Sequence, residues 1–77
     1  MREYEVVREI ENSCERNQMR DVFFQEIQCE DPEQYVRAMF AGQKYEIDVQ
    51  PQENGNAVIF VRSGNVDQKF LFTLLDD

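Results

Sequence analysis

The segment Cys29–Ile47, CEDPEQYVRAMFAGQKYEI, decides the fold because it fits two different structures. In the first, residues 31–33 (Asp-Pro-Glu) form a tight loop with proline at the second position of a type I turn. Residues 34–41 are then a strand, and Gly42 supplies the positive φ of a short hairpin that leads into the next strand. This hairpin gives two strands of matching length.

The second structure is a helix over residues 32–41. Asp31 would be its N-cap, Pro32 its first residue, and Glu33 an acidic residue favoured by the helix dipole. The helix would carry an apolar stripe that ends before Gly42 and consists of Tyr35, Val36, Met39 and Phe40. A helix of about nine residues is near the lower limit for globular proteins, so the sequence favours the hairpin and keeps the helix as the alternative.

Residues 3–17 have the spacing of an amphipathic helix. Val6, Val7 and Ile10 fall on one side of it together with Cys14. Polar and charged residues occupy the other side. The spacing therefore predicts an N-terminal helix that packs on the rest of the chain.

Four other segments have the composition of β-strands, and they span residues 21–29, 44–50, 57–62 and 67–75. The pair Asn54-Gly55 is a strong turn signal between the second and third of them. We therefore predict an α+β fold in which the N-terminal helix packs on a four- or five-stranded antiparallel β-meander. If residues 32–41 are a second short helix, the sheet has fewer strands. The length predicts a single small domain over residues 1–77.

Charge and hydropathy exclude several classes of partner. The net charge is −8, from 16 acidic and 8 basic residues, so direct binding to nucleic acid or to anionic lipid is disfavoured. No apolar run approaches the roughly 20 residues of a membrane span. The first residues lack the apolar core of a signal peptide, which predicts a cytoplasmic protein whose Cys14 and Cys29 stay reduced.

The residue types needed for catalysis are scarce. The chain has no histidine, and two cysteines without histidine do not complete a tetrahedral zinc site. The three isolated glycines form no phosphate-binding loop. Glu46 and Asp48 alternate with apolar residues and are interpreted as the solvated side of a strand. We therefore expect no enzyme activity, no catalytic or metal-binding residue and no cofactor.

The strands are apolar on both faces, which predicts an interaction surface. One helix is about 10 Å wide and a five-stranded sheet about 24 Å, so one face should stay uncovered. An exposed apolar patch of this kind usually contacts a partner or a second copy. The predicted surface consists of Phe24, Tyr35, Met39, Ile59 and Leu71. A one-residue change of register would replace these by Phe23, Val36, Phe40, Phe60 and Phe72.

The N-terminal segment also carries a candidate acidic surface made of Glu3, Glu5, Glu9, Glu11 and Glu15. The sequence favours a protein–protein interaction module, with homodimerisation through the apolar sheet face as its simplest form. An alternative is an acidic mimic that inhibits a nucleic-acid-binding protein. Another alternative is a carrier of a small apolar ligand, which is disfavoured because 77 residues leave little room for a pocket.

Overall fold

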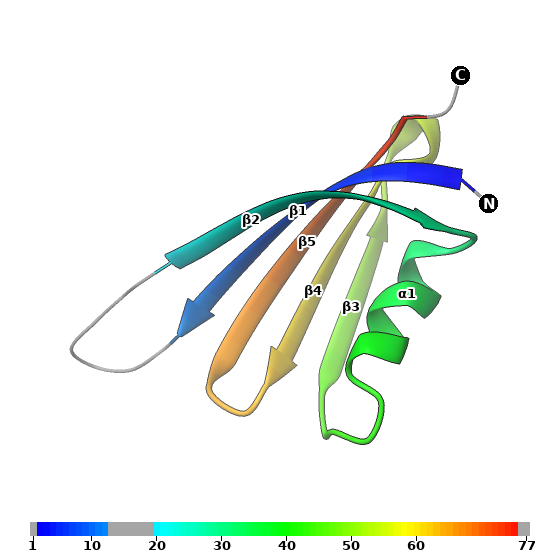
Figure 1. Cartoon of the computed structure of the whole chain (residues 1–77). Helices are drawn as coiled ribbons and strands as arrows, with labels where there is room; N and C mark the ends of the chain where they lie inside the picture. The colour runs from blue at the N-terminus through cyan, green and yellow to red at the C-terminus, as the bar shows by residue number, and fades with distance from the viewer. Residues whose placement is uncertain (1, 13–19, 76–77) are drawn as a thin grey trace.

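The computed structural model describes residues 2–12 and 20–75. Over these residues the chain forms one antiparallel sheet and one α-helix (Figure 1). The elements are β1 (Arg2–Asn12), β2 (Arg20–Cys29), α1 (Pro32–Met39), β3 (Glu46–Pro51), the short 3-10 helix η1 (Glu53–Gly55), β4 (Ala57–Ser63) and β5 (Val66–Leu74). The predicted α+β class and antiparallel sheet are therefore confirmed.

The order of the strands is β2-β1-β5-β4-β3, and every neighbouring pair is antiparallel. The first and last strands are therefore neighbours near the middle of the sheet. The predicted β-meander is wrong, because β2 pairs with β1 and not with β3, the next strand along the chain. Val7 in β1, for example, lies opposite Phe24 of β2 on one side and Leu71 of β5 on the other. The strands β2 and β3 form the two edges. In Figure 1 the sheet is strongly twisted, and α1 links the end of one edge strand to the start of the other.

The predicted N-terminal helix is wrong, because residues 2–12 form the strand β1. Tyr4, Val6 and Ile10 alternate with acidic residues at a period of two, and Tyr4 and Val6 are fully buried in the sheet. In a helix, Glu5 and Glu9 would lie one turn apart and repel each other. In the extended strand, they lie farther apart. The part of the predicted helix that contains Cys14 lies outside the described residues.

The favoured hairpin at residues 34–41 is also wrong, and the helix alternative is correct. Asp31 is the N-cap, and its side-chain Oδ1 accepts a hydrogen bond from the backbone N–H of Glu33 at 3.1 Å. Pro32 occupies the first turn, where its missing N–H has no cost. Arg37 Nε donates to Glu33 Oε2 at 2.8 Å one turn later. The sheet keeps five strands because β1 supplies the one that the helix removes.

The other predicted strands are confirmed, as is the turn at Asn54-Gly55. Both turn residues have positive φ, 61° for Asn54 and 81° for Gly55. The positive φ favours glycine at position 55, and a Cβ there would also force the Leu74 side chain to move, because it would lie 2.7 Å from Leu74 Cδ2. Asn56 Oδ1 accepts a hydrogen bond from the Leu74 N–H at 2.9 Å and so fixes the turn to β5.

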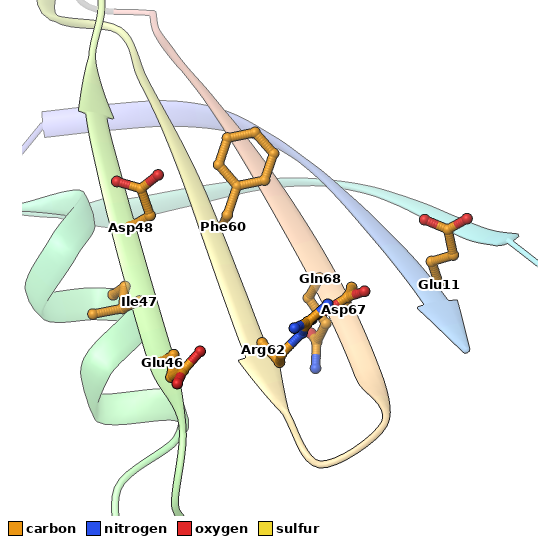
Figure 2. Close-up of a pocket in the computed structure, with 8 residues that line it drawn as sticks. All are labelled: Glu11, Glu46, Ile47, Asp48, Phe60, Arg62, Asp67 and Gln68. Atoms are coloured by element: carbon orange, nitrogen blue, oxygen red, sulfur yellow. Dashed lines mark hydrogen bonds and ion pairs between the residues drawn. The ribbon is translucent and has the colours of Figure 1, made fainter. Parts of the chain in front are cut away.

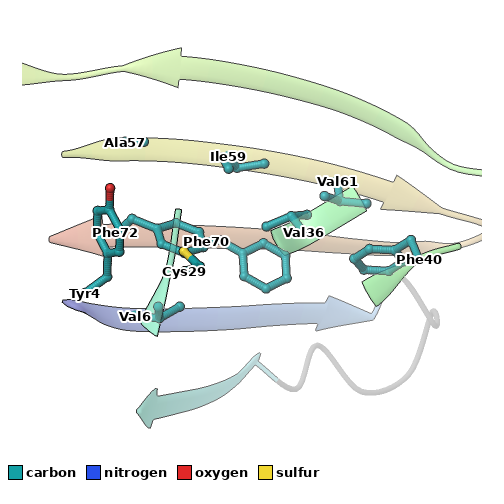
Figure 3. Close-up of a cluster of buried hydrophobic side chains, with 10 residues drawn as sticks. All are labelled: Tyr4, Val6, Cys29, Val36, Phe40, Ala57, Ile59, Val61, Phe70 and Phe72. Atoms are coloured by element: carbon teal, nitrogen blue, oxygen red, sulfur yellow. The ribbon is translucent and has the colours of Figure 1, made fainter. Parts of the chain in front are cut away.

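The hydrophobic core lies between α1 and one face of the sheet, here named the helix face. Phe70 and Phe72 of β5 are at its centre. The rings of Tyr4 and Phe72 pack edge to face, with 5.8 Å between their centroids. Val36 and Phe40 reach the core from the helical segment. The buried set, drawn in Figure 3, is Tyr4, Val6, Cys29, Val36, Phe40, Ala57, Ile59, Val61, Phe70 and Phe72. The opposite side of the sheet has no described element packed on it and is named the open face.

Two adjacent residues of β4 test this division of the sheet. Ile59 is 0% exposed on the helix face, whereas Phe60 is 39% exposed on the open face. Ile59→Ala should lower the free energy of unfolding by about 2–5 kcal/mol, and Phe60→Ala by under about 1 kcal/mol. Urea titration measures both. Equal losses for the two variants would contradict the assignment of the faces.

The N-cap of α1 gives a second test. Asp31→Ala removes the acceptor for the Glu33 N–H and should lower the free energy of unfolding by about 0.5–2 kcal/mol. Asp31→Asn is the matched control, because asparagine caps helices about as well and should restore most of that stability. A loss of equal size in both variants would show that capping is not the role of Asp31.

Candidate interaction surface

The open face carries a continuous apolar row across four strands. Phe24 of β2, Val7 of β1, Leu71 of β5 and Val58 of β4 lie opposite one another in register, one from each strand. Phe24 is 72% exposed, and the other three are half-buried. These four residues are called the apolar row below. The row runs across the strands and forms an extended apolar surface.

A second row lies one step along the strands and mixes apolar and charged residues. It contains Val22, Glu9, Lys69, Phe60 and Asp48, again one from each strand. The Lys69 Nζ lies 5.8 Å from the centre of the Phe60 ring, in the arrangement of a cation–π contact. The exposed aromatic ring of Phe60 is thus already in contact with a cationic group of the chain itself.

Most of the negative charge of the described side chains is on the open face. They include eight carboxylates and two basic groups there, a net charge of −6, and the register places one further basic residue, Arg20, on this side of β2. The carboxylates are those of Glu3, Glu5, Glu9, Glu11, Glu26, Glu46, Asp48 and Asp67, and the bases are Arg62 and Lys69. The remaining described side chains nearly balance, with five carboxylates and four basic groups. The sheet therefore has one strongly acidic side.

A hollow of about 500 Å³ lies on this face where β3, β4 and β5 meet (Figure 2). Its lining includes Phe60 and four carboxylates, those of Glu11, Glu46, Asp48 and Asp67. Arg62 Nε donates to Asp67 Oδ1 at 2.9 Å. That bond holds the pKa of the Asp67 carboxyl below its ordinary value and raises the pKa of Arg62. The hollow suits the cationic end of a lysine or arginine better than an apolar ligand.

The predicted acidic surface exists in a different form from the one expected. Glu3, Glu5, Glu9 and Glu11 lie on a strand rather than on a helix, and alternation places all four on the open face. Glu5 faces Glu26 directly across the β1–β2 pair, so two like charges are opposed there. The Gln28 amide donates to Glu3 Oε1 at 3.1 Å. Glu15 lies outside the described residues.

The structure brings together only part of the predicted apolar surface. Phe24 and Leu71 lie on the open face. Ile59 is buried on the helix face, and Tyr35 and Met39 extend from α1 onto the core, so these three do not contribute. Tyr35 and Met39 were misplaced because residues 34–41 were interpreted as a strand.

The set expected from a shifted register is also divided. Phe60 is on the open face, whereas Val36, Phe40 and Phe72 are core residues. Phe23 is on the helix-face side of β2, where it is nevertheless 52% exposed. Val7 was not expected on this surface, because the helical spacing of residues 3–17 predicted a helix there. The alternation of glutamates around it was the signal that would have found it.

Cys29 is a buried free thiol at the end of β2. Burial raises its pKa, the negative charge of Asp31 adds to this, and a hydrogen bond with the backbone at Asp31 opposes it. The neutral thiol is therefore favoured, which suits a small core residue and not a nucleophile. Cys14 lies outside the described residues.

The described residues contain neither a cluster that could bind a metal ion nor a membrane-spanning helix. Residues 2–12 and 20–75 contain no group of three or more histidine, cysteine or acidic side chains placed to hold a metal ion. The described helices are too short and too polar to cross a bilayer. Glu46 and Asp48 are exposed, as expected for the solvated side of a strand.

Comparison with protein-family models, with curated proteins and with solved structures gave no match. The fold alone does not define a function.

The burial of Cys29 predicts slow reaction with alkylating reagents. In a Cys14→Ser variant, which leaves Cys29 as the one thiol, iodoacetamide at pH 8 should react at least about tenfold more slowly with folded than with urea-unfolded protein. Mass spectrometry over time gives both rates. Equal rates would mean that the Cys29 end of β2 is open to solvent.

Proposed function

We propose that this chain is a non-enzymatic protein-binding module whose open face docks on a basic surface of another protein. The observation that carries the proposal is the apolar row surrounded by a net charge of −6 on one side of the sheet. Apolar area supplies affinity, and the acidic border selects a partner of opposite charge. The cytoplasmic location and the single domain expected from the sequence are part of this proposal.

The same charge disfavours face-to-face homodimerisation, the simplest form expected from the sequence. Stacking two open faces would bring two net charges of −6 into one interface, and juxtaposed like charges cost several kcal/mol. Only Lys69 and Arg62 would be available among the described side chains of that face as partners for the carboxylates, and Arg62 already binds Asp67. A basic foreign surface meets no such repulsion.

The arrangement of the face indicates how such a partner would bind. An apolar part of the partner would cover Val7, Leu71 and Val58 and remove their remaining exposed apolar surface from water, which favours binding. A lysine or arginine of the partner would enter the hollow beside the Phe60 ring and pair with Asp48 or Glu46. Exposed ion pairs contribute only about 0.2–1 kcal/mol each, so the apolar row should supply most of the affinity.

Nucleic-acid mimicry is a second candidate, and one observation favours it. Glu3 and Glu5 are about 6.8 Å apart along β1, and so are Glu9 and Glu11. All four lie on the open face, where their regular spacing resembles that of the phosphates of a nucleic acid. Val7 interrupts the series at its middle. A mimic depends on charge alone and should lose its partner steeply in salt, whereas binding through the apolar row should persist.

The carrier of an apolar ligand has less support. The hollow shown in Figure 2 is lined largely by charged side chains and opens on the surface of the sheet. The tightly packed aromatic rings of Phe70 and Phe72 occupy the space between α1 and the sheet. An apolar ligand would have to displace core side chains to enter there.

A synthetic peptide of ten alternating leucine and lysine residues tests the proposed function. Titrated into the ¹⁵N-labelled protein, it should shift the amide resonances of Val7, Val58, Leu71 and Phe60 and leave those of α1 unchanged. Raising the salt concentration from 0.1 M to 1 M should weaken the binding but leave it measurable, because the apolar contacts remain. The matched control is a peptide of alternating leucine and glutamate, which should not bind.

A pair of variants makes this test specific for the open face. Phe60→Lys adds a positive charge beside the hollow and should weaken binding of the leucine–lysine peptide about fivefold or more. Phe23→Lys adds the same charge on the other side of the sheet and should leave that binding unchanged at protein concentrations at which the wild type is monomeric. Shifts centred on α1, or equal binding of the acidic peptide, would contradict the proposed function.

A further inference from the structure

The edge strand β2 exposes large apolar side chains on both of its sides. Val22 and Phe24 point to the open face and are 43% and 72% exposed, and Phe23 between them points to the other face and is 52% exposed. A partner that docks on the open face covers only the first two. A strand that pairs along the edge brings neighbours to both sides and covers all three.

The two edges of the sheet differ in how they are protected from such pairing. The edge strand β3 has only six residues and ends in Pro51, and both features discourage an added strand. The strand β2 has ten residues, with no proline and no lysine. Its register with β1 is continuous from Cys29 to Arg20, so no bulge twists the edge away. Its outward backbone groups are therefore suited to pair with another strand.

We propose that a second copy of this chain pairs with β2 in antiparallel orientation, so that the two sheets join edge to edge. Paired residues of an antiparallel ladder share a face, so a two-fold axis must pass through a residue position. An axis at Phe23 places Phe23 opposite itself and Val22 opposite Phe24 of the second copy. An axis at Phe24 would place Val22 opposite Glu26, and an axis at Val22 would place Phe23 opposite Asp21.

The register centred on Phe23 is also complementary in charge. It places Arg20 opposite Glu26 of the second copy, so residues of opposite charge occupy paired positions at both ends of the apolar centre. Asp21 falls opposite Gln25, a neutral residue. No two acidic residues of β2 are paired. The segment Arg20–Glu26 is therefore self-complementary in the sense that a two-fold interface requires.

The two-fold axis of such a pair is perpendicular to the sheet, which keeps both open faces on the same side. The apolar row of one copy would then continue into Val22 of the other. The dimer would present one acidic surface with two apolar rows, larger than either face alone. This pairing stands on the β2 edge and does not depend on what the open face binds.

Sedimentation equilibrium over a range of protein concentrations tests the proposal. The average mass of the wild type should rise from the 9.2 kDa of one chain toward twice that value at high micromolar concentration. It should do so equally in 0.1 M and 1 M salt, because backbone pairing and apolar contacts dominate. Phe23→Lys places a charge at the axis of the interface and should keep the protein monomeric. Its thermal unfolding should resemble that of the wild type, since Phe23 is exposed.

Phe60→Lys is the matched control for this experiment, because the same change on β4 lies far from the edge and should leave the dimer intact. A wild type that stays monomeric at every concentration would overturn the proposal. So would dissociation by Phe60→Lys but not by Phe23→Lys, which would indicate association through the open face. Failure of the leucine–lysine peptide to bind a dimeric protein would count against the proposed function alone.

Discussion

The pairing of β1 with β5 is the constraint on which the rest of the structure depends. It joins the first and last strands of the chain near the centre of the sheet, with Tyr4 opposite Leu74 and Val6 opposite Phe72. Without it, β1 and β2 would be an isolated two-stranded sheet, which is marginally stable in water, and the three-stranded sheet of β3, β4 and β5 would lose Tyr4 and Val6 from its core. With it, β1 and β5 place Val6, Phe70 and Phe72 under α1, and fix which residues face away from the helix.

The alternation of side chains along β1 then determines which of its residues lie on the open face. Once Tyr4 and Val6 are buried, every odd-numbered residue from Glu3 to Glu11 must lie on the open face. The chain places glutamate at four of those five positions and Val7 at the fifth. The acidic border and the apolar row are therefore consequences of a single register, and a slip by one residue would destroy both.

Most of the strands were predictable from sequence, and the errors in the N-terminal segment, in residues 34–41 and in the strand order have physical causes. Segments such as 57–62 alternate clearly or are bounded by strong turns, and their strands follow from local signals. Residues 2–12 contain both a helical and a two-residue period, and only pairing with β2 and β5, far away in the sequence, selects the strand. After Cys29, the residues Asp31 and Pro32 correctly indicated the start of a helix. The hairpin was favoured because a helix of about nine residues is short. Phe24, Leu71 and the four described residues of the acidic set lie on the open face, whereas Ile59 lies on the helix face, which was not predicted because strand register was undetermined from the sequence.

Hydrogen exchange of the β1 amides, followed by NMR in the intact protein, tests the central position of β1 most directly. The account predicts that the amides of Val6 and Val7 that are bonded to neighbouring strands exchange only on global unfolding. Their opening free energies should equal those of Phe70 and Phe72 in β5. Exchange of β1 amides that is orders of magnitude faster than exchange in β4 and β5 would contradict the account, because the open face would then have no fixed composition.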